Sequence, residues 1–133
     1  MARAKKAAIF GDQLVGIGIK IVKPVVPIIP PFPFPLPFNG TFNQMLTFTV
    51  RIQGKAAAVF GSVARSKRPA IPPPGTTFVI PPRNMGFLVQ GSRTVSLEKR
   101  KAGREGDLGI PETDIPAPTA KVKVKGRRTV FIG

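Results

Sequence analysis

Thr49-Val50-Arg51-Ile52-Gln53-Gly54-Lys55-Ala56-Ala57-Ala58-Val59-Phe60-Gly61-Ser62 is the stretch that decides the fold, because its pattern returns elsewhere in the chain. The second copy is Thr94-Val95-Ser96-Leu97-Glu98-Lys99-Arg100-Lys101-Ala102-Gly103-Arg104-Glu105-Gly106-Asp107. Only the back half appears near the start, as Lys5-Lys6-Ala7-Ala8-Ile9-Phe10-Gly11-Asp12, and only the front half at the end, as Arg128-Thr129-Val130-Phe131-Ile132-Gly133. Joined head to tail, the two ends rebuild the unit, so Ile132 should lie near Ala7. Three equivalent units predict pseudo-threefold symmetry, which suits the axis of a homotrimer.

The composition predicts one small all-β domain over residues 1–133. A chain of 133 residues is long enough for one modest core. Its 14 Gly and 16 Pro favour short strands and turns over helices. No stretch has the periodicity of an amphipathic helix.

Missing residue types exclude most enzyme chemistry. The chain contains no His and no Cys, so the usual nitrogen and sulfur ligands of zinc, thiol nucleophiles and a Ser-His-Asp triad are all absent. Its six acidic residues leave little for paired-carboxylate catalysis. We therefore expect no enzyme activity, no cofactor and no small-molecule substrate.

The apolar run from Ile21 to Phe38 does not predict a membrane helix. It carries seven prolines between Pro24 and Pro37, and a helix does not tolerate prolines at that density. We expect an extended, polyproline-like loop there. No secretory signal is evident.

A net charge of +15 suggests a rival function. Such a charge is typical of proteins that bind nucleic acid through phosphate contacts. No nucleic-acid-binding motif accompanies it, and the alternative is that these cations are solvated strand faces that keep an apolar protein soluble.

Turn signals and alternation place the expected elements. Asn39-Gly40 predicts a turn after the Pro-rich loop. A further loop is expected over Arg65–Gly75, and an acidic one up to Pro118. The expected extended segments are Leu14–Val22, Leu46–Gln53, Ala56–Ala58, Thr77–Ile80, Met85–Gln90 and Lys121–Ile132.

Over nearly its whole length the chain resembles the PAAR-repeat proteins, which cap the spike of contractile injection machines. Gly91-Ser92-Arg93-Thr94-Val95 and Pro81-Pro82-Arg83-Asn84-Met85-Gly86 match the strand-opening pattern of that family. The name-giving motif is degenerate and falls on Ala56-Ala57-Ala58-Val59, Lys101-Ala102-Gly103-Arg104 and Lys6-Ala7-Ala8-Ile9.

The resemblance implies a small cone of three hairpin units with long Pro-rich loops, whose broad base sits on a homotrimeric β-helical spike. One cap per trimer would sharpen the spike for mechanical piercing and touch the target membrane transiently. The protein would then lie at the tip of a phage tail, a bacteriocin-like particle, an extracellular injection system or a type VI secretion apparatus. The sequence leaves open which of these machines it serves, and a nucleic-acid-binding β-domain remains the alternative.

Many relatives hold a metal near the apex, and the matching positions fall here on Lys20, Leu36, Ala70 and Glu112. No metal site is carried over. We expect the apex to be held by packing of Phe32, Phe34, Leu36 and Ile71 instead. The alternative is a buried ion pair between Lys20 and Glu112.

Two apolar positions in the front half of the repeat are equivalent in all three units. We expect these residues to form the core of the cone; the alternative is that they contact the spike. They are Val50, Ile52, Val95, Leu97, Val130 and Ile132.

Overall fold

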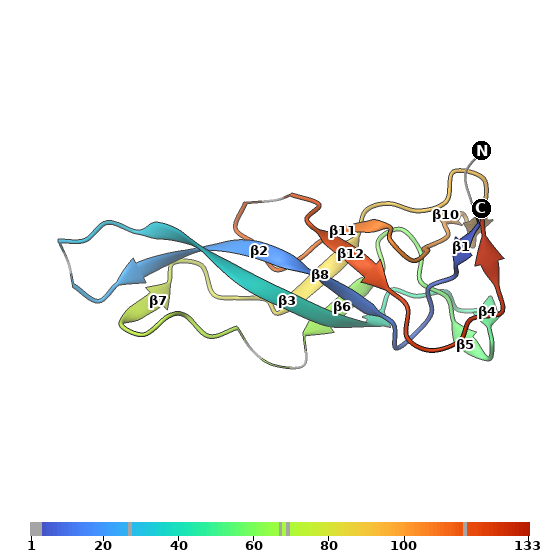
Figure 1. Cartoon of the computed structure of the whole chain (residues 1–133), viewed down its shortest axis with the longest axis horizontal. Coiled ribbons are helices and arrows are strands. Elements are labelled where there is room, and N and C mark those ends of the chain that lie inside the picture. Colours follow the sequence, from blue (N-terminus) through green and yellow to red (C-terminus); the bar gives the residue numbers. More distant parts are fainter. Residues whose placement is uncertain (1–3, 27, 67, 69, 116) are drawn as a thin grey trace.

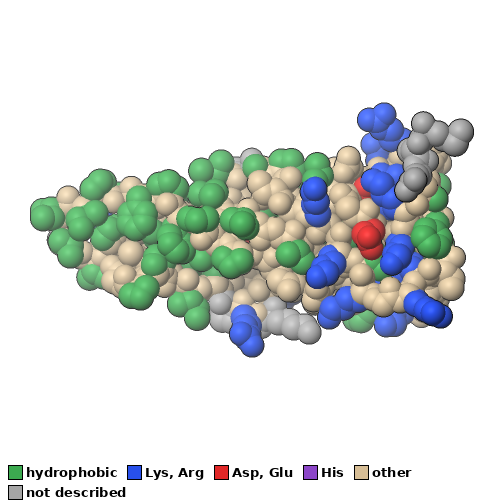
Figure 2. Space-filling view, viewed as in Figure 1, with side chains coloured by type: hydrophobic (Ala, Val, Ile, Leu, Met, Phe, Trp, Pro, Cys, Tyr) green, Lys and Arg blue, Asp and Glu red, His purple; other side chains and the backbone are tan. Residues whose placement is uncertain are grey.

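The computed structural model describes residues 4–26, 28–66, 68, 70–115 and 117–133, and the protein is all-β. Its outline tapers from a broad end, where both termini lie, to a narrow end formed by the turn between β2 and β3 (Figures 1 and 2). The strands are β1 (Lys5–Lys6), β2 (Gln13–Pro24), β3 (Phe32–Gln44), β4 (Arg51–Ile52), β5 (Lys55–Ala56), β6 (Val63–Ser66), β7 (Thr76–Phe78), β8 (Met85–Leu88), β9 (Ser96–Leu97), β10 (Arg100–Lys101), β11 (Leu108–Ile110), β12 (Ala120–Lys123) and β13 (Phe131–Ile132).

One long hairpin sets the length of the molecule. β2 and β3 pair antiparallel from Gln13↔Thr41 to Val22↔Phe32 and carry the chain out to the narrow end. The seven-stranded sheet runs in the order β12-β11-β8-β6-β3-β2-β7. A further pairing of β12 with β2 closes the strands from β12 to β2 into a barrel, and β7 lies outside it. Side chains from its inner face, including Leu14, Phe42 and Leu88, are fully buried and form the main core.

Three two-stranded antiparallel pairs form the broad end, and they confirm the threefold repeat. β4 pairs with β5, β9 with β10, and β1 with β13, which joins the two ends of the chain through Lys5↔Ile132. Three isolated bridges then connect each unit to the next in a closed cycle: Ala7↔Arg104, Ile9↔Ala57 and Val59↔Ala102. The residue between the bridged positions continues the cycle, since Ala8 N donates to Gly103 O, Gly103 N to Ala58 O and Ala58 N to Ala8 O, at 3.0, 2.8 and 3.0 Å.

The same tight turn ends each unit, at the same place in the repeat. Each turn has a glycine in the left-handed region, with φ of 92° at Gly11, 89° at Gly61 and 86° at Gly106, where a side chain would be strained. The residue after the glycine caps the turn: Asp12 accepts from Ile9 N at 2.9 Å, and Ser62 Oγ accepts from Val59 N at 2.9 Å. Asp107 accepts from Arg104 N in the same way, at 2.8 Å.

Most of the Pro-rich run lies in strands, so the polyproline-like loop expected up to Phe38 is wrong for residues 21–24, in β2, and 32–38, in β3. Pro33, Pro35 and Pro37 lie in β3 opposite Ile21, Ile19 and Ile17. In an antiparallel pair only alternate residues exchange hydrogen bonds, and a proline, which has no N–H, fits the positions that face away. Prolines at every second position therefore leave the pairing with β2 intact.

The turn predicted at Asn39-Gly40 is also wrong, because both residues continue β3. Gly40 serves close packing instead. A Cβ there would lie 2.7 Å from the ring of Phe38, so the glycine leaves room for that buried aromatic side chain.

The other expected strands are found with shifted or shorter bounds, whereas the acidic loop expected up to Pro118 begins with β11. Leu46–Gln53 contains only the short β4, and Arg65–Gly75 begins inside β6. Thr77–Ile80 corresponds to β7 and Met85–Gln90 to β8.

Candidate functional site: the threefold base and the buried lysine

The turns of the two hairpins β4–β5 and β9–β10 hold neighbouring units together. The two-residue turn Gln53-Gly54 has φ of 52° and 80°, and the equivalent turn Glu98-Lys99 has φ of 52° and 68°. Gln53 Oε1 accepts from Thr129 N at 2.8 Å, in the segment leading to β13. Glu98 reaches the corresponding segment before β4. Each of these two turns thus holds the segment that leads into the first strand of a neighbouring unit, in addition to the closed cycle of bridges.

Glu98 makes more hydrogen bonds to its neighbouring unit than Gln53 does. Its carboxylate accepts from Phe48 N at 3.0 Å, Thr49 N at 2.8 Å and Val50 N at 3.1 Å. The N–H groups of Phe48 and Thr49, followed by that of Val50, lower the pKa of Glu98 from 4.5 to about 2.

A titration experiment tests this role of Glu98. Because the pKa of Glu98 is lowered by folding, its contribution to stability is complete above pH 4.5 and is lost as the pH falls through about 2. We expect Glu98→Gln to melt below the wild type at pH 6, and the gap in melting temperature to shrink towards pH 2. Glu105→Gln, at an exposed position, is the control and should show no such closing gap. A gap that stays constant with pH would contradict that role.

The six equivalent apolar residues divide between core and surface. Ile52 and Ile132 are buried in a second core cluster with Ala7, Ala57 and Ala102, and Val95 and Leu97 pack against it. Val50 is half-buried and Val130 is exposed. Most of the set therefore serves as core, and contact with a partner at these positions stays a prediction.

Lys20 is the unusual feature of the tapering half. It lies in β2, is 1% exposed, and its ammonium donates to Glu112 Oε1 at 3.1 Å and to Asp114 Oδ1 at 2.8 Å. The ammonium also lies 5.6 Å from the centre of the Phe78 ring. The ion pair between Lys20 and Glu112 is thus present, and the sequence prediction missed its second carboxylate.

Each carboxylate also ties down backbone. Asp114 Oδ2 accepts from Ile21 N at 2.7 Å, and Glu112 Oε1 accepts from Arg83 N at 2.9 Å. The cluster therefore joins β2, the segment before β8 and the loop after β11 at one buried point. A buried charge with this many partners is the arrangement that offsets its loss of hydration.

Gly18 is the residue that lets this loop approach β2. A Cβ on Gly18 would lie 1.9 Å from the backbone oxygen of Glu112, so any side chain there would push the loop away. Thr113 Oγ1 accepts from Ile19 N at 3.0 Å and seals the same contact. Gly16 and Gly18, two glycines on the same face of a strand, were the sequence signal for a close approach.

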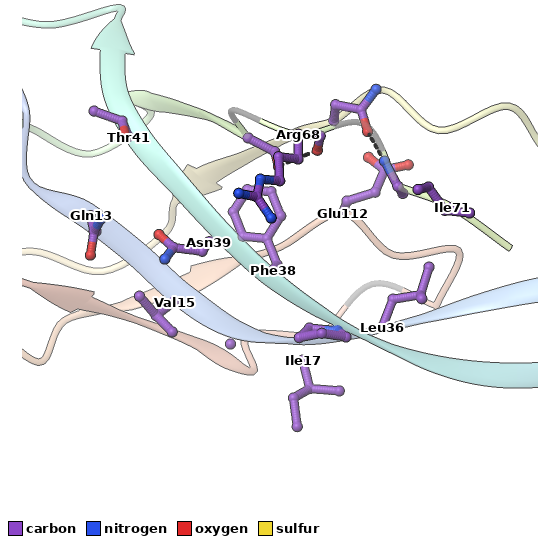
Figure 3. A pocket seen from close by; sticks show the side chains of 15 residues that line it. Gln13, Val15, Ile17, Leu36, Phe38, Asn39, Thr41, Arg68, Ile71 and Glu112 are labelled. Carbon is purple, nitrogen blue, oxygen red and sulfur yellow. Dashed lines mark hydrogen bonds between the residues drawn. The ribbon is translucent and has the colours of Figure 1, made fainter. Parts of the chain in front are cut away.

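The four positions that match the metal ligands of PAAR-repeat proteins do not fit a metal here. Leu36, Ala70 and Glu112 line one groove of about 820 Å³, and Figure 3 shows Leu36 and Glu112 there. Lys20 forms an ion pair with Glu112 at 3.1 Å. Among these four residues only Glu112 could bind a metal ion, and the ammonium of Lys20 beside it would repel one. No group of three His, Cys, Asp or Glu that could hold a metal occurs in the part of the chain that the structure describes.

The packing expected around the apex is only partly present. Phe34 and Leu36 are half-buried, whereas Phe32 is exposed and Ile71 is 76% exposed. Ile71 therefore adds little to the cohesion of the tapering half, because a side chain so exposed buries little apolar area. The buried ion cluster lies at the same level of the molecule and ties its segments together.

Charge and apolar surface separate along the long axis. Figure 2 shows Lys and Arg over the broad half and apolar side chains over the narrow half. Segments 21–38 and 70–82 contain a single charged residue, Lys23. No helix of the described residues is long and apolar enough to cross a membrane.

Comparisons with protein-family models, with curated proteins and with solved structures find no match for this chain. The geometry of the base and of the narrow end is therefore the basis for the function proposed below.

Proposed function

We propose that this protein caps the end of a homotrimeric spike in a contractile injection machine, with its broad end on the spike and its narrow end pointing away. The observation that carries this proposal is the closed cycle of three bridges at the broad end. A single chain can face three identical subunits in the same way only if it presents three similar surfaces.

The taper supports the same function. A blunt trimer of β-strands ends in unpaired strand edges, and a cap that covers them prevents edge-to-edge association. The narrow end then provides the point that is driven into a target envelope. The cap would lie at the tip of a phage tail, a bacteriocin-like particle, an extracellular injection system or a type VI apparatus.

Co-expression with a homotrimeric β-helical spike protein from the same source tests the proposal. We expect a complex of one cap to three spike subunits, measured by native mass spectrometry. A spike protein from an unrelated machine is the control. Failure to form any complex with a folded trimer from the same source would contradict the cap function.

Circular permutation tests the equivalence of the three units. Joining Gly133 to Met1 and opening the chain between Gln53 and Gly54, or between Glu98 and Lys99, moves the open hairpin to another unit. Both openings fall in two-residue turns. We expect both permutants to fold, with melting temperatures within a few degrees of the wild type, and to bind the same spike. Unfolded permutants would mean that the third unit differs in kind from the other two.

The second candidate is nucleic-acid binding, favoured by the gathering of Lys and Arg over the broad half (Figure 2). Three cations of this chain, Lys20, Arg104 and Arg128, are already held by carboxylates inside the protein. A gel shift that weakens steeply with salt, together with no spike complex, would favour this candidate over the cap.

A further inference from the structure

The narrow end exposes several large apolar side chains to solvent. We call residues 24–32 the point, apart from residue 27, which lies outside the described residues. Ile28 is 89% exposed and Val25 is 69% exposed. Val26, Ile29 and Phe32 are also exposed. Contiguous apolar surface of this kind on a folded protein marks a contact with a partner or a membrane.

Backbone polarity is low at the point as well. Pro24, Pro30 and Pro31 have no N–H. Val25 N donates to Gly75 O at 3.0 Å, and Ile29 N donates to Val26 O at 3.2 Å. Few backbone donors would therefore need a partner if the point left water, and unsatisfied donors are what usually keep non-helical backbone out of hydrocarbon.

The edge of β3 next to the point disfavours a protein strand as the partner. Pro33, Pro35 and Pro37 occupy the positions of β3 that face away from β2, so this edge offers no N–H to an added strand. Strand addition needs those main-chain donors. A partner that binds without hydrogen bonds fits better, and the acyl chains of a lipid bilayer are such a partner.

Length and charge fit one leaflet. From Lys23 to Ile28 the chain spans at most roughly 17 Å at about 3.3 Å per residue. The hydrocarbon core of one leaflet is about 15 Å deep, half of the whole bilayer. Lys23 would then lie at the headgroups, where an exposed cation meets lipid phosphate. The basic broad half follows behind it (Figure 2).

We propose that the point inserts unaided into one leaflet of a bilayer that carries anionic lipid. This binding goes beyond the cap function, because it requires neither a trimeric spike nor a contracting sheath. Lipid affinity at the tip would hold the particle on the membrane before force is applied. The isolated chain suffices to test it.

Flotation with vesicles of equal parts phosphatidylcholine and phosphatidylglycerol measures the binding. We expect the wild type to float with the vesicles, and Ile28→Glu to lower the partition coefficient at least ~tenfold, because a carboxylate is costly in hydrocarbon. The matched control is Phe60→Glu. Phe60 is an exposed apolar residue of the broad end, and its equivalent in the second unit is Glu105, so this position accepts an acidic side chain. Circular dichroism is used to check that both variants are folded.

Depth is measured with a single tryptophan, since the chain has none. We expect Ile28→Trp to shift its emission to the blue on vesicles and to be quenched by lipids brominated on the acyl chains. Ile71→Trp, farther from the point, should not be quenched.

Three outcomes would overturn the proposal. These are no flotation of the wild type, equal flotation of Ile28→Glu, or binding that salt abolishes while Trp at position 28 stays unquenched. Salt-sensitive binding without quenching would show that only the basic broad half binds, by electrostatic attraction to the lipid headgroups. None of these results bears on the complex with the trimer, so the two proposals fail separately.

Discussion

Replacing Lys20 by methionine is expected to lower the free energy of unfolding by about 3–5 kcal/mol, the usual cost of removing one partner from a buried ion pair. Methionine fills a similar volume, so the loss comes from charge. The carboxylates of Glu112 and Asp114, whose side chains are 11% and 5% exposed, would remain buried without their cation. Urea unfolding, followed by circular dichroism, measures the change.

The control is Lys23→Met in the same strand, where the lysine is exposed and the expected effect is small. The triple variant Lys20→Met, Glu112→Gln, Asp114→Asn removes both stranded charges, and we expect it to recover part of the loss. A cost below about 1 kcal/mol for Lys20→Met alone would mean that the cation is not needed to hold this half of the molecule together.

The second large effect is expected at Asp12, where the two ends of the chain are tied together. Arg128 Nη2 donates to Asp12 Oδ1 at 2.6 Å and to Oδ2 at 2.7 Å, and Asp12 is 2% exposed. Asp12 also accepts from Lys125 N at 3.0 Å and caps its own turn through Ile9 N. We expect Asp12→Ala to cost about 3–5 kcal/mol, because it leaves a buried guanidinium without its carboxylate.

Asp12→Ser separates the two roles of this carboxylate. Serine is the residue that caps the equivalent turn at Ser62, so it should restore the cap, worth about 1 kcal/mol, but not the bond to Arg128. Both variants should open the third unit selectively.

Hydrogen exchange detects that opening. Ala7 N donates to Val130 O at 3.0 Å, and its equivalent Ala102 N donates to Val95 O at 3.0 Å. In Asp12→Ala we expect exchange at Ala7 to accelerate far more than at Ala102, which is the internal control. Equal acceleration at both amides would show that Asp12 supports the whole base and not the closure of one unit.

Much of the base was predictable from the sequence. The repeat fixes which residues are equivalent, and left-handed turns at Gly11, Gly61 and Gly106 are a local property that glycine makes possible. Closure of the third unit through Lys5↔Ile132 follows from the same repeat. These features could be predicted because the same residues occur at equivalent positions of each repeat.

The Pro-rich hairpin was not predictable by the same means. Proline disfavours strands, and only the pairing register with β2 shows that Pro33, Pro35 and Pro37 all face away from their partner strand. Local propensity predicts a loop here. The prolines are tolerated because they face away from β2, and the local sequence does not show which strand will pair with them.

The sequence by itself thus determined an all-β domain with three equivalent units, two of them intact and one built from both ends, because turn chemistry and repeat spacing are local. Only the tertiary structure decided what stabilises the tapering half. Lys20 meets Glu112 and Asp114 across 92 and 94 residues of chain. This contact forms because Gly18 lets the loop after β11 pack closely on β2. The conformational preferences of neighbouring residues do not determine which distant segments pack together.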